Sequence, residues 1–267
     1  MYKVKEHPEI ISQVQDGSCI AFGGNVLYRS PIRVARELAR AGKKNLHLVK
    51  TAMAMEADIL CACGCVSKVS AGFVGYETEF GLCGFYRKGV ESQAVEAEEH
   101  ACYSVITALR AAGYGVPFLP IRGFDGSDLP EAVGFQKVSD PYTGEELTAI
   151  RAIRPDFAFI HVQRADRNGN TQILGPVYED LIMARSPRHL VITCEELVED
   201  DYFGRERKAD IPQVLVESVA VVKGCAAPGS CDGYYDLDRE ELRRFKRMTA
   251  AEVAEVFCGN GGNDENI

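Results

Sequence analysis

The stretch Cys19-Ile20-Ala21-Phe22-Gly23-Gly24, followed shortly by Ser30-Pro31, decides the fold of this chain. Four apolar residues in a row, without polar alternation, are typical of a strand covered on both faces. Ser30 fits a helix N-cap, Pro31 the first helical position and Gly42 the end of that helix. The stretch therefore predicts a buried strand, a glycine turn and a helix.

The same alternation continues along the chain. Further strands are expected at Leu46–Lys50, Val66–Val74, Phe118–Ile121, Phe157–Val162, Leu190–Thr193 and Val214–Val222. Further helices are expected at Met53–Ala62, Ala94–Ala112, Val177–Arg185 and Arg239–Val256. Repeated strand–helix–strand units predict an α/β fold, a mostly parallel sheet flanked by helices. In such sheets ligands bind at the carboxyl ends of the strands.

The chain reads as a single domain over residues 1–267, without internal repeats or a convincing linker. The region Gly123–Glu146 is rich in Gly, Asp and Pro, which predicts a long functional loop or a lid. We expect the tail, about residues 259–267, to be flexible because it is rich in Gly and Asn.

Composition excludes several classes of protein. The 267 residues are 46% apolar and carry a formal charge of -9, with no basic stripe, so nucleic acid is not an expected partner. No apolar run is long enough to cross a bilayer, so no membrane association is expected. The start, Met1–Glu6, lacks the apolar stretch of a signal peptide. These features predict a cytoplasmic protein.

Ten cysteines are many for such a chain, and in the cytoplasm we expect thiols rather than disulfides. Cys61, Cys63 and Cys65 form the run C-A-C-G-C. One interpretation is a metal or cluster site, although such sites usually space their ligands C-x2-C and need a fourth. The other interpretation, which we favour, is small buried apolar side chains and no metal.

Two glycine-containing turns are candidate binding sites at the carboxyl edge of the sheet. At the first, Gly23 and Gly24 would let backbone N–H groups approach a thioester or carboxylate oxygen. The second follows the strand that ends at Val74, and its candidate residues are Gly72, Phe73, Gly75, Tyr76 and Glu77. For both turns the structural alternative is an ordinary turn relieved by glycine.

Two ionisable residues stand out in apolar surroundings. Glu99 lies three residues before Cys102 and extends the apolar stripe of the expected helix, where a carboxylate is costly unless it is paired or used. It is therefore a candidate catalytic residue, with helix stabilisation as the alternative. His161 closes an apolar strand ahead of a turn at Asn168-Gly169, and is either a general base or a structural histidine.

Several motifs resemble those of family I CoA-transferases. Asp16-Gly17, then Gly23-Gly24, then Pro31 resemble the family's first signature, with departures at Asn25 and Arg29 beside the acyl site. The resemblance to glutaconate-type α subunits continues over nearly the whole chain, in Gly115–Pro120, Pro155–His161, Asp166–Asn170, Thr193–Glu196, Asp210–Pro212 and Cys231–Asp236. The family's G-A-H-P segment is Cys225-Ala226-Ala227-Pro228 here, without the histidine.

The resemblance implies a CoA-transferase-like fold and an α subunit that needs a β subunit, in an α2β2 or larger assembly. In two-chain members the nucleophilic glutamate lies on the β subunit in an S-E-N-G-type motif, which is absent here. Coenzyme A is then a substrate, no cofactor is bound permanently, and no catalytic residue is expected on this chain apart from the candidate Glu99. Asn25, with the glycine turns, would wall the acyl pocket. Arg29 and Arg122 are candidates to hold a distal carboxylate of a small, possibly dicarboxylic, acid.

Two other functions stay open at this point. Related two-chain proteins hydrolyse CoA esters and open rings, relying on an acidic residue in the helix that resembles Ala94–Ala112. Cys102 is the matching position here, and Glu99 lies one helical turn earlier. The other function is a non-catalytic binding or metal-sensing protein that uses the C-A-C-G-C run.

Overall fold

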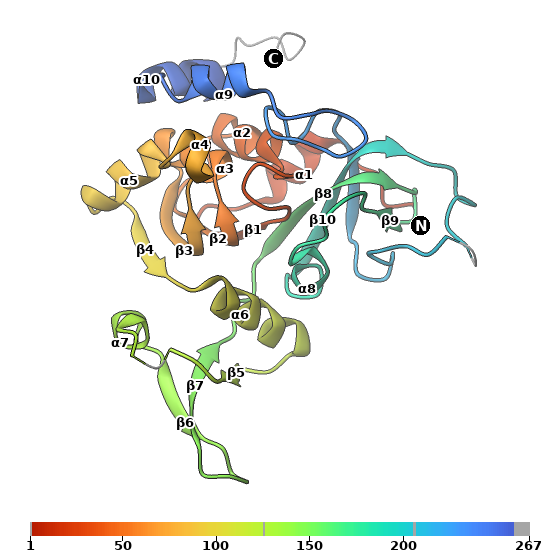
Figure 1. Cartoon of the computed structure of the whole chain (residues 1–267). Coiled ribbons are helices and arrows are strands. Elements are labelled where there is room, and N and C mark those ends of the chain that lie inside the picture. The colour runs from red at the N-terminus through yellow and green to blue at the C-terminus, as the bar shows by residue number, and fades with distance from the viewer. Residues whose placement is uncertain (1, 125, 205–206, 259–267) are drawn as a thin grey trace.

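A parallel sheet forms the centre of the computed structural model, which describes residues 2–124, 126–204 and 207–258 (Figure 1). Its strands run in the order β11-β10-β8-β1-β2-β3-β4, and β9 pairs antiparallel with β8. The bounds are β1 Cys19–Phe22, β2 Leu46–Met53, β3 Val66–Val74, β4 Glu96–Glu99, β8 Phe157–Ala165, β9 Thr171–Gln172, β10 His189–Leu197 and β11 Ser218–Val221. The predicted α/β fold is confirmed.

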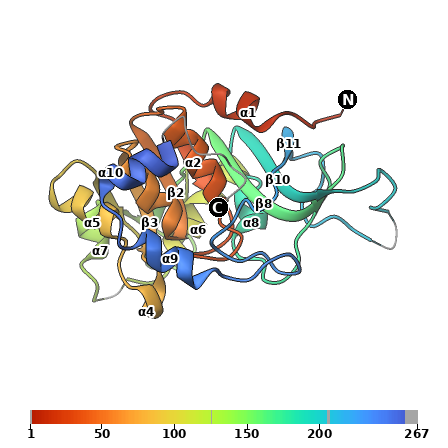
Figure 2. The ribbon, with the colours of Figure 1, turned by 90° about the horizontal axis from the view of Figure 1, so that it is seen from above.

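Helices cover both faces of this sheet, as Figures 1 and 2 show. One face carries α1 (His7–Gln13), α2 (Ile32–Arg40), α3 (Met55–Ala62), α5 (Gly84–Glu91), α9 (Arg239–Phe245), α10 (Ala250–Val253) and the π-helical turn η1 (Ala254–Cys258). The other face carries α6 (Cys102–Tyr114) and α8 (Asp180–Met183). The short helix α4 (Glu77–Phe80) follows β3. Each face therefore has its own apolar core, and the central strands read as continuous apolar runs for this reason.

A second, smaller sheet projects from the α6 side (Figure 1). It is antiparallel, in the order β5-β7-β6, with β5 Phe118–Ile121, β6 Gln136–Ser139 and β7 Glu146–Arg151, and it is accompanied by α7 (Leu129–Val133). The predicted strand at Phe118–Ile121 exists but belongs to this sheet. The predicted loop Gly123–Glu146 holds a helix and a hairpin strand instead, so the prediction of a bare loop was wrong. The single-domain interpretation stays a prediction.

The helix predicted over Ala94–Ala112 is wrong in its first part. Residues 96–99 form the edge strand β4, and α6 begins only at Cys102. Lys68 of β3 lies 3.1 Å from the Glu96 carboxylate and 2.9 Å from that of Glu98, and these cross-strand ion pairs favour the strand.

Three other predicted elements differ at their ends. Ser30 does not cap α2, because its Oγ accepts a hydrogen bond of 2.6 Å from Lys50 Nζ and Pro31 is the N-cap. Of the helix predicted over Val177–Arg185, only α8 is helical. Of the strand predicted over Val214–Val222, only β11 is a strand. The C-terminal helix is interrupted between α9 and α10, where Thr249 caps a new start. The predicted flexible tail, 259–267, lies outside the described residues. Within the described ranges, no helix combines the length and the apolar character needed to cross a membrane.

His7, at the start of α1, makes the stability of the folded chain depend on pH. Burial, helped by the Arg33 charge, lowers the pKa of the His7 imidazole from 6.5 to about 4. Between these values the unfolded chain binds a proton that the folded chain does not, so stability falls as pH is lowered through this window. We expect His7→Gln to flatten the dependence of the melting temperature on pH between 6.5 and 4. Parallel curves for variant and wild type would contradict this assignment.

Candidate active site

The glycine turn after β1 lies at the carboxyl end of the central strand, as predicted. Its backbone amides, however, are used within the chain. The N–H of Gly23 donates to Phe159 O at 2.8 Å and that of Gly24 to Asp180 Oδ1 at 2.9 Å. The N–H of Asn25 donates to Tyr28 O at 2.8 Å. The turn therefore offers a ligand its surface and the half-buried Asn25 side chain, not these three N–H groups as we expected.

Asp180, at the start of α8, fixes this turn through both of its oxygens. Oδ1 accepts the Gly24 N–H, and Oδ2 accepts a bond of 2.7 Å from the guanidinium of Arg29. Arg29 also donates to the carbonyl oxygens of His161 and Pro176, each at 2.9 Å. Its side chain is 3% exposed and that of Asp180 is 0% exposed. The Arg29 guanidinium is thus occupied within the chain, which favours a positioning role over contact with a substrate carboxylate.

Only glycine fits at both positions of the turn. A Cβ on Gly23 would lie 2.6 Å from Asp180 Oδ1, and one on Gly24 would lie 2.2 Å from Tyr28 O. Gly24 also has a φ of +69°, in the left-handed region. The glycines are therefore required by close backbone packing, which holds whether or not a ligand binds.

A second layer connects β2 and β3 to the same region. The buried Glu179 carboxylate accepts hydrogen bonds from the hydroxyl of Thr51 and, at 3.3 Å, from its N–H. The thiol of Cys102, at the start of α6, lies 3.6 Å from Thr51 O. A Cβ on Gly72 would lie 2.4 Å from Cys102 N, so this glycine lets α6 pack onto β3. The contacts place Glu179, Thr51, Cys102 and Gly72 beside the turn, because Glu179 precedes Asp180.

Cys102 is exposed, yet its thiol is not activated. Burial of part of the side chain, and then the charge of Glu179, raise the pKa of the Cys102 thiol. A raised pKa keeps the thiol protonated at neutral pH, and the thiolate is the nucleophilic form. Cys102 is therefore not an activated nucleophile, and its thiol contacts Thr51 O instead.

The residues predicted after β3 divide into buried and exposed ones. Tyr76 is 1% exposed and donates a hydrogen bond of 3.0 Å to the buried Asp58, so its hydroxyl serves the core. Gly75 is buried with its N–H on Met53 O, whereas Phe73 and Glu77 are exposed. A Cβ on Gly75 would lie 3.0 Å from the Phe73 ring.

A cleft of about 540 Å³ joins these segments on the surface. Its lining includes Tyr28 of the glycine turn, Glu77 after β3 and Asp232 of a C-terminal loop. The other charged lining residues are Glu79, Asp236 and Arg239, and Arg239 lies 3.2 Å from the Glu79 carboxylate. Because the lining is acidic, an anionic ligand needs positive charge from elsewhere.

Two predicted site residues lie apart from this region. Glu99 is exposed on the edge strand β4, so its helical spacing from Cys102 does not apply. Arg122 belongs to the small sheet, where it is 73% exposed and pairs with Glu145 at 2.6 Å. Among the described residues, neither side chain forms a hydrogen bond or ion pair with the glycine turn. Their assignment to a substrate site stays a prediction.

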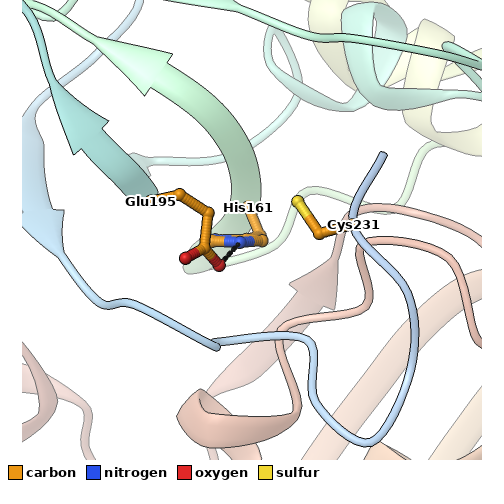
Figure 3. A group of neighbouring side chains, drawn as sticks. All are labelled: His161, Glu195 and Cys231. Atoms are coloured by element: carbon orange, nitrogen blue, oxygen red, sulfur yellow. Dashed lines mark hydrogen bonds and ion pairs between the residues drawn. The ribbon is translucent and has the colours of Figure 1, made fainter. Parts of the chain in front are cut away.

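His161 is buried in the middle of β8, not at the end of its strand as expected, and it belongs to a polar cluster with side chains of β10, drawn in Figure 3. Its Nε2 lies 2.9 Å from Glu195 Oε1 and its Nδ1 lies 3.0 Å from Thr193 Oγ1. The buried Cys231 lies beside the ring. Contacts with the neighbouring cysteines and Glu195 outweigh burial and hold the pKa of His161 well above its usual value. His161 is enclosed, so it cannot act as a base toward a surface ligand.

The C-A-C-G-C run follows the apolar interpretation for two of its three members. Burial raises the pKa of the thiols of Cys61 and Cys65, which pack with the core between the sheet and α3. Cys63 differs, because it is disulfide-bonded. It lies half-buried at the C-cap of α3 and also packs against this core, but its disulfide means that the expectation of thiols alone was wrong.

Several residues of this region escaped the sequence interpretation, above all Asp180, Glu179, Thr51 and the buried pair Lys50–Glu56, whose charged atoms lie 2.8 Å apart. Lys50 stands in an apolar run and the acidic pair Glu179-Asp180 precedes Leu-Ile-Met, so a charge among apolar residues was the available signal. Their partners lie far away in sequence and are brought close only by the fold.

A family model for coenzyme A transferases matches residues 5–222. The chain belongs to the coenzyme A transferase family. It is 32% identical to the A chain of the 3-oxoadipate CoA-transferase of Pseudomonas knackmussii, over 84% of this chain and 80% of that one. It is 28% identical to the A chain of the glutaconate CoA-transferase of Acidaminococcus fermentans, over 93% and 84%. The A-type chain, an enzyme component, is therefore its counterpart in the two-chain members.

Solved structures support the family assignment, and the similar proteins carry names of several different activities. The crystal structure of the Acidaminococcus fermentans glutaconate CoA-transferase has a TM-score of 0.91 at 26% identity, covering 98% of this chain and 90% of that chain. A variant of the decarboxylase AibA/AibB has a TM-score of 0.87 at 29% identity, covering 96% and 98%. The cholesterol ring-cleaving hydrolase IpdA subunit of Mycobacterium tuberculosis is 32% identical over 92% of this chain and 87% of that one. A 33% identical protein from Archaeoglobus fulgidus is longer, and this chain covers 54% of it.

Proposed function

We propose that this chain is the α subunit of a heteromeric CoA-transferase that moves CoA between an acyl-CoA and a small dicarboxylic acid. The nucleophilic glutamate lies on a partner β subunit. The chain supplies one wall of the acyl pocket through Gly23, Gly24 and Asn25, with Gly72, Cys102 and Glu179 behind them. The similarity to the A chains of 3-oxoadipate and glutaconate CoA-transferases supports a dicarboxylate, since both named acids carry two carboxyl groups.

The observation that carries this proposal is the state of the chain's own carboxylates at the sheet edge. Glu179, Asp180 and Glu195 are buried and each accepts hydrogen bonds within the chain. A carboxylate that attacks an acyl-CoA must reach the thioester carbon. These three buried carboxylates are thus occupied within the chain, which supports a nucleophile from another chain.

The acidic cleft supports a partner for a second reason. An acyl-CoA carries several negative charges, and Glu77, Asp232 and Asp236 repel it. Positive charge for the CoA phosphates then comes from the β subunit. We therefore propose an α2β2 or larger assembly, in which this chain forms one wall of the acyl pocket and the β subunit binds the CoA phosphates. We propose that it works in the cytoplasm, with CoA as substrate and no resident cofactor.

Borohydride trapping tests the proposal on the native complex purified with its partner. We expect incubation with dicarboxylic acyl-CoA esters, then borohydride, to change the mass of the partner chain only, because borohydride reduces a glutamyl thioester. A mass change on this chain would place the nucleophile here and contradict the proposal.

Two other outcomes distinguish the activities of the relatives. Free CoA released without a mass change on either chain would favour a CoA-ester hydrolase, for which the buried Glu179 beside Cys102 is the nearest acidic group on this chain. Loss of carbon dioxide with the thioester intact would favour a decarboxylase. Native purification that recovers this chain without any partner chain, together with no CoA transfer, hydrolysis or decarboxylation in the cell extract that contains it, would favour the non-catalytic alternative.

A further inference from the structure

Three side chains of different chemistry meet where the middle of β8 and the C-terminal part of β10 face the segment 224–235. The ligand atoms of His161, Glu195 and Cys231 all lie within 4.8 Å of one another, and all three residues are buried (Figure 3). In the part of the chain that the structure describes, no other group of three such residues has this geometry. Imidazole nitrogen, carboxylate oxygen and thiolate sulfur are the three kinds of protein donor that zinc accepts.

We propose that His161, Glu195 and Cys231 bind a zinc ion that ties β8 and β10 to the segment 224–235. The site is distinct from the acyl pocket, and it goes beyond the proposed transfer reaction.

Hydrogen bonds from neighbouring residues orient the His161 and Glu195 side chains, as the residues behind the ligands do in metal sites. Thr193 Oγ1 lies 3.0 Å from His161 Nδ1, which leaves Nε2 directed at Glu195. Glu195 is anchored by the Gly224 N–H, at 3.0 Å and 2.9 Å from its two oxygens, and by the Tyr235 hydroxyl at 2.8 Å. Two of the three ligands are thereby held in place before an ion arrives.

Only a small adjustment is needed to admit the ion. Donor atoms on a tetrahedral zinc ion lie roughly 3.4 Å apart, from its bond lengths of about 2.1 Å. His161 Nε2 and Glu195 Oε1 are 2.9 Å apart, so they must separate by a few tenths of an ångström. Binding releases the thiol proton of Cys231 and the second ring proton of His161 to solvent, so that a thiolate and a neutral ring bind the ion.

The ion would stabilise one wall of the surface cleft. Ser230 and Asp232, on either side of Cys231, both line that cleft. The segment from 224 to 235 also contacts the sheet through its hydrogen bonds to Glu195 and through the bond of 3.1 Å from Gln163 Nε2 to Asp232 O, and its Ser230 pairs with Tyr28. Loss of zinc is therefore expected to loosen the segment that carries Ser230 and Asp232.

The test uses the untagged complex, purified without chelator and without added metal. We expect elemental analysis to find about one zinc ion per copy of this chain. After the metal is removed and replaced with cobalt, we expect a near-ultraviolet thiolate-to-cobalt absorption band. Cys231→Ser, which is nearly isosteric, should lose both the zinc and the band.

Cys194→Ala is the matched control, since Cys194 is a buried thiol next to Glu195 that packs in the core on the other face of the sheet. It should keep zinc and the cobalt band. If Cys231→Ser gives no folded complex, Glu195→Gln tests the same site by removing the carboxylate charge. Wild type that neither contains zinc nor takes up cobalt would overturn the proposal, and so would unchanged zinc in Cys231→Ser or in Glu195→Gln. None of these readouts depends on CoA transfer, so the zinc site and the proposed function fail separately.

Discussion

Gly24→Ala should abolish activity and lower the melting temperature of the complex, whereas Gly17→Ala should have a small effect. Both glycines lie in the left-handed region, with φ values of +69° and +79°, so alanine strains both backbones by about 1–2 kcal/mol. They differ in their surroundings. The new Cβ would lie 2.2 Å from Tyr28 O at position 24, but it meets nothing within 4 Å at position 17. In Gly24→Ala, the backbone of the glycine turn must therefore move.

The pair of variants isolates the contact from the conformational strain. We expect Gly24→Ala to cost at least about 3 kcal/mol, because overpacking against backbone adds to the strain. The measurements are the melting temperature and the rate of CoA transfer by the complex with its partner chain. Similar losses in the two variants would mean that close packing of the turn against residue 28 is not what requires glycine there.

The parts of the fold predicted correctly are those governed by local pattern. β1 and β3 have the predicted bounds: β1 is an apolar run followed by two glycines, and β3 is rich in β-branched and apolar residues and is followed by Gly75. The Glu96–Glu99 strand was missed because its polar residues carry no strand pattern of their own. Pairing with β3 and the two ion pairs of Lys68 decide its conformation, and these contacts involve residues about thirty positions away.

In the candidate site, too, the features set by neighbouring residues were predicted and those set by residues distant in sequence were not. The position of the glycine turn at the sheet edge followed from the sequence, because strand, turn and helix are consecutive. Its chemistry did not, since Asp180 reaches the turn from 156 residues away in sequence. Arg29 was interpreted as a substrate ligand because an isolated arginine beside a glycine turn has no visible partner in the sequence. Only the fold shows that Asp180 is that partner.

Asp180→Asn should be strongly destabilising, and it tests whether Arg29 serves the fold. Asparagine keeps an oxygen for the Gly24 N–H but places an amide, which donates, or a neutral oxygen against the buried guanidinium. Breaking a buried ion pair in this way leaves an uncompensated charge and costs about 3–5 kcal/mol. For a chain of this size, that corresponds to a fall in melting temperature of roughly 10 °C. Activity should fall with it, since Asp180 also fixes the turn.

The control is a pair of the same chemistry on the surface. Arg122 and Glu145 lie 2.6 Å apart with side chains 73% and 40% exposed, so Glu145→Gln should leave the melting temperature nearly unchanged. Arg29→Ala discriminates further. If Arg29 holds the fold, this variant loses stability as Asp180→Asn does. If it instead holds a substrate carboxylate, the complex stays stable and the Michaelis constant for the acid rises. A stable Asp180→Asn complex together with a raised Michaelis constant in Arg29→Ala would therefore return Arg29 to the acyl pocket.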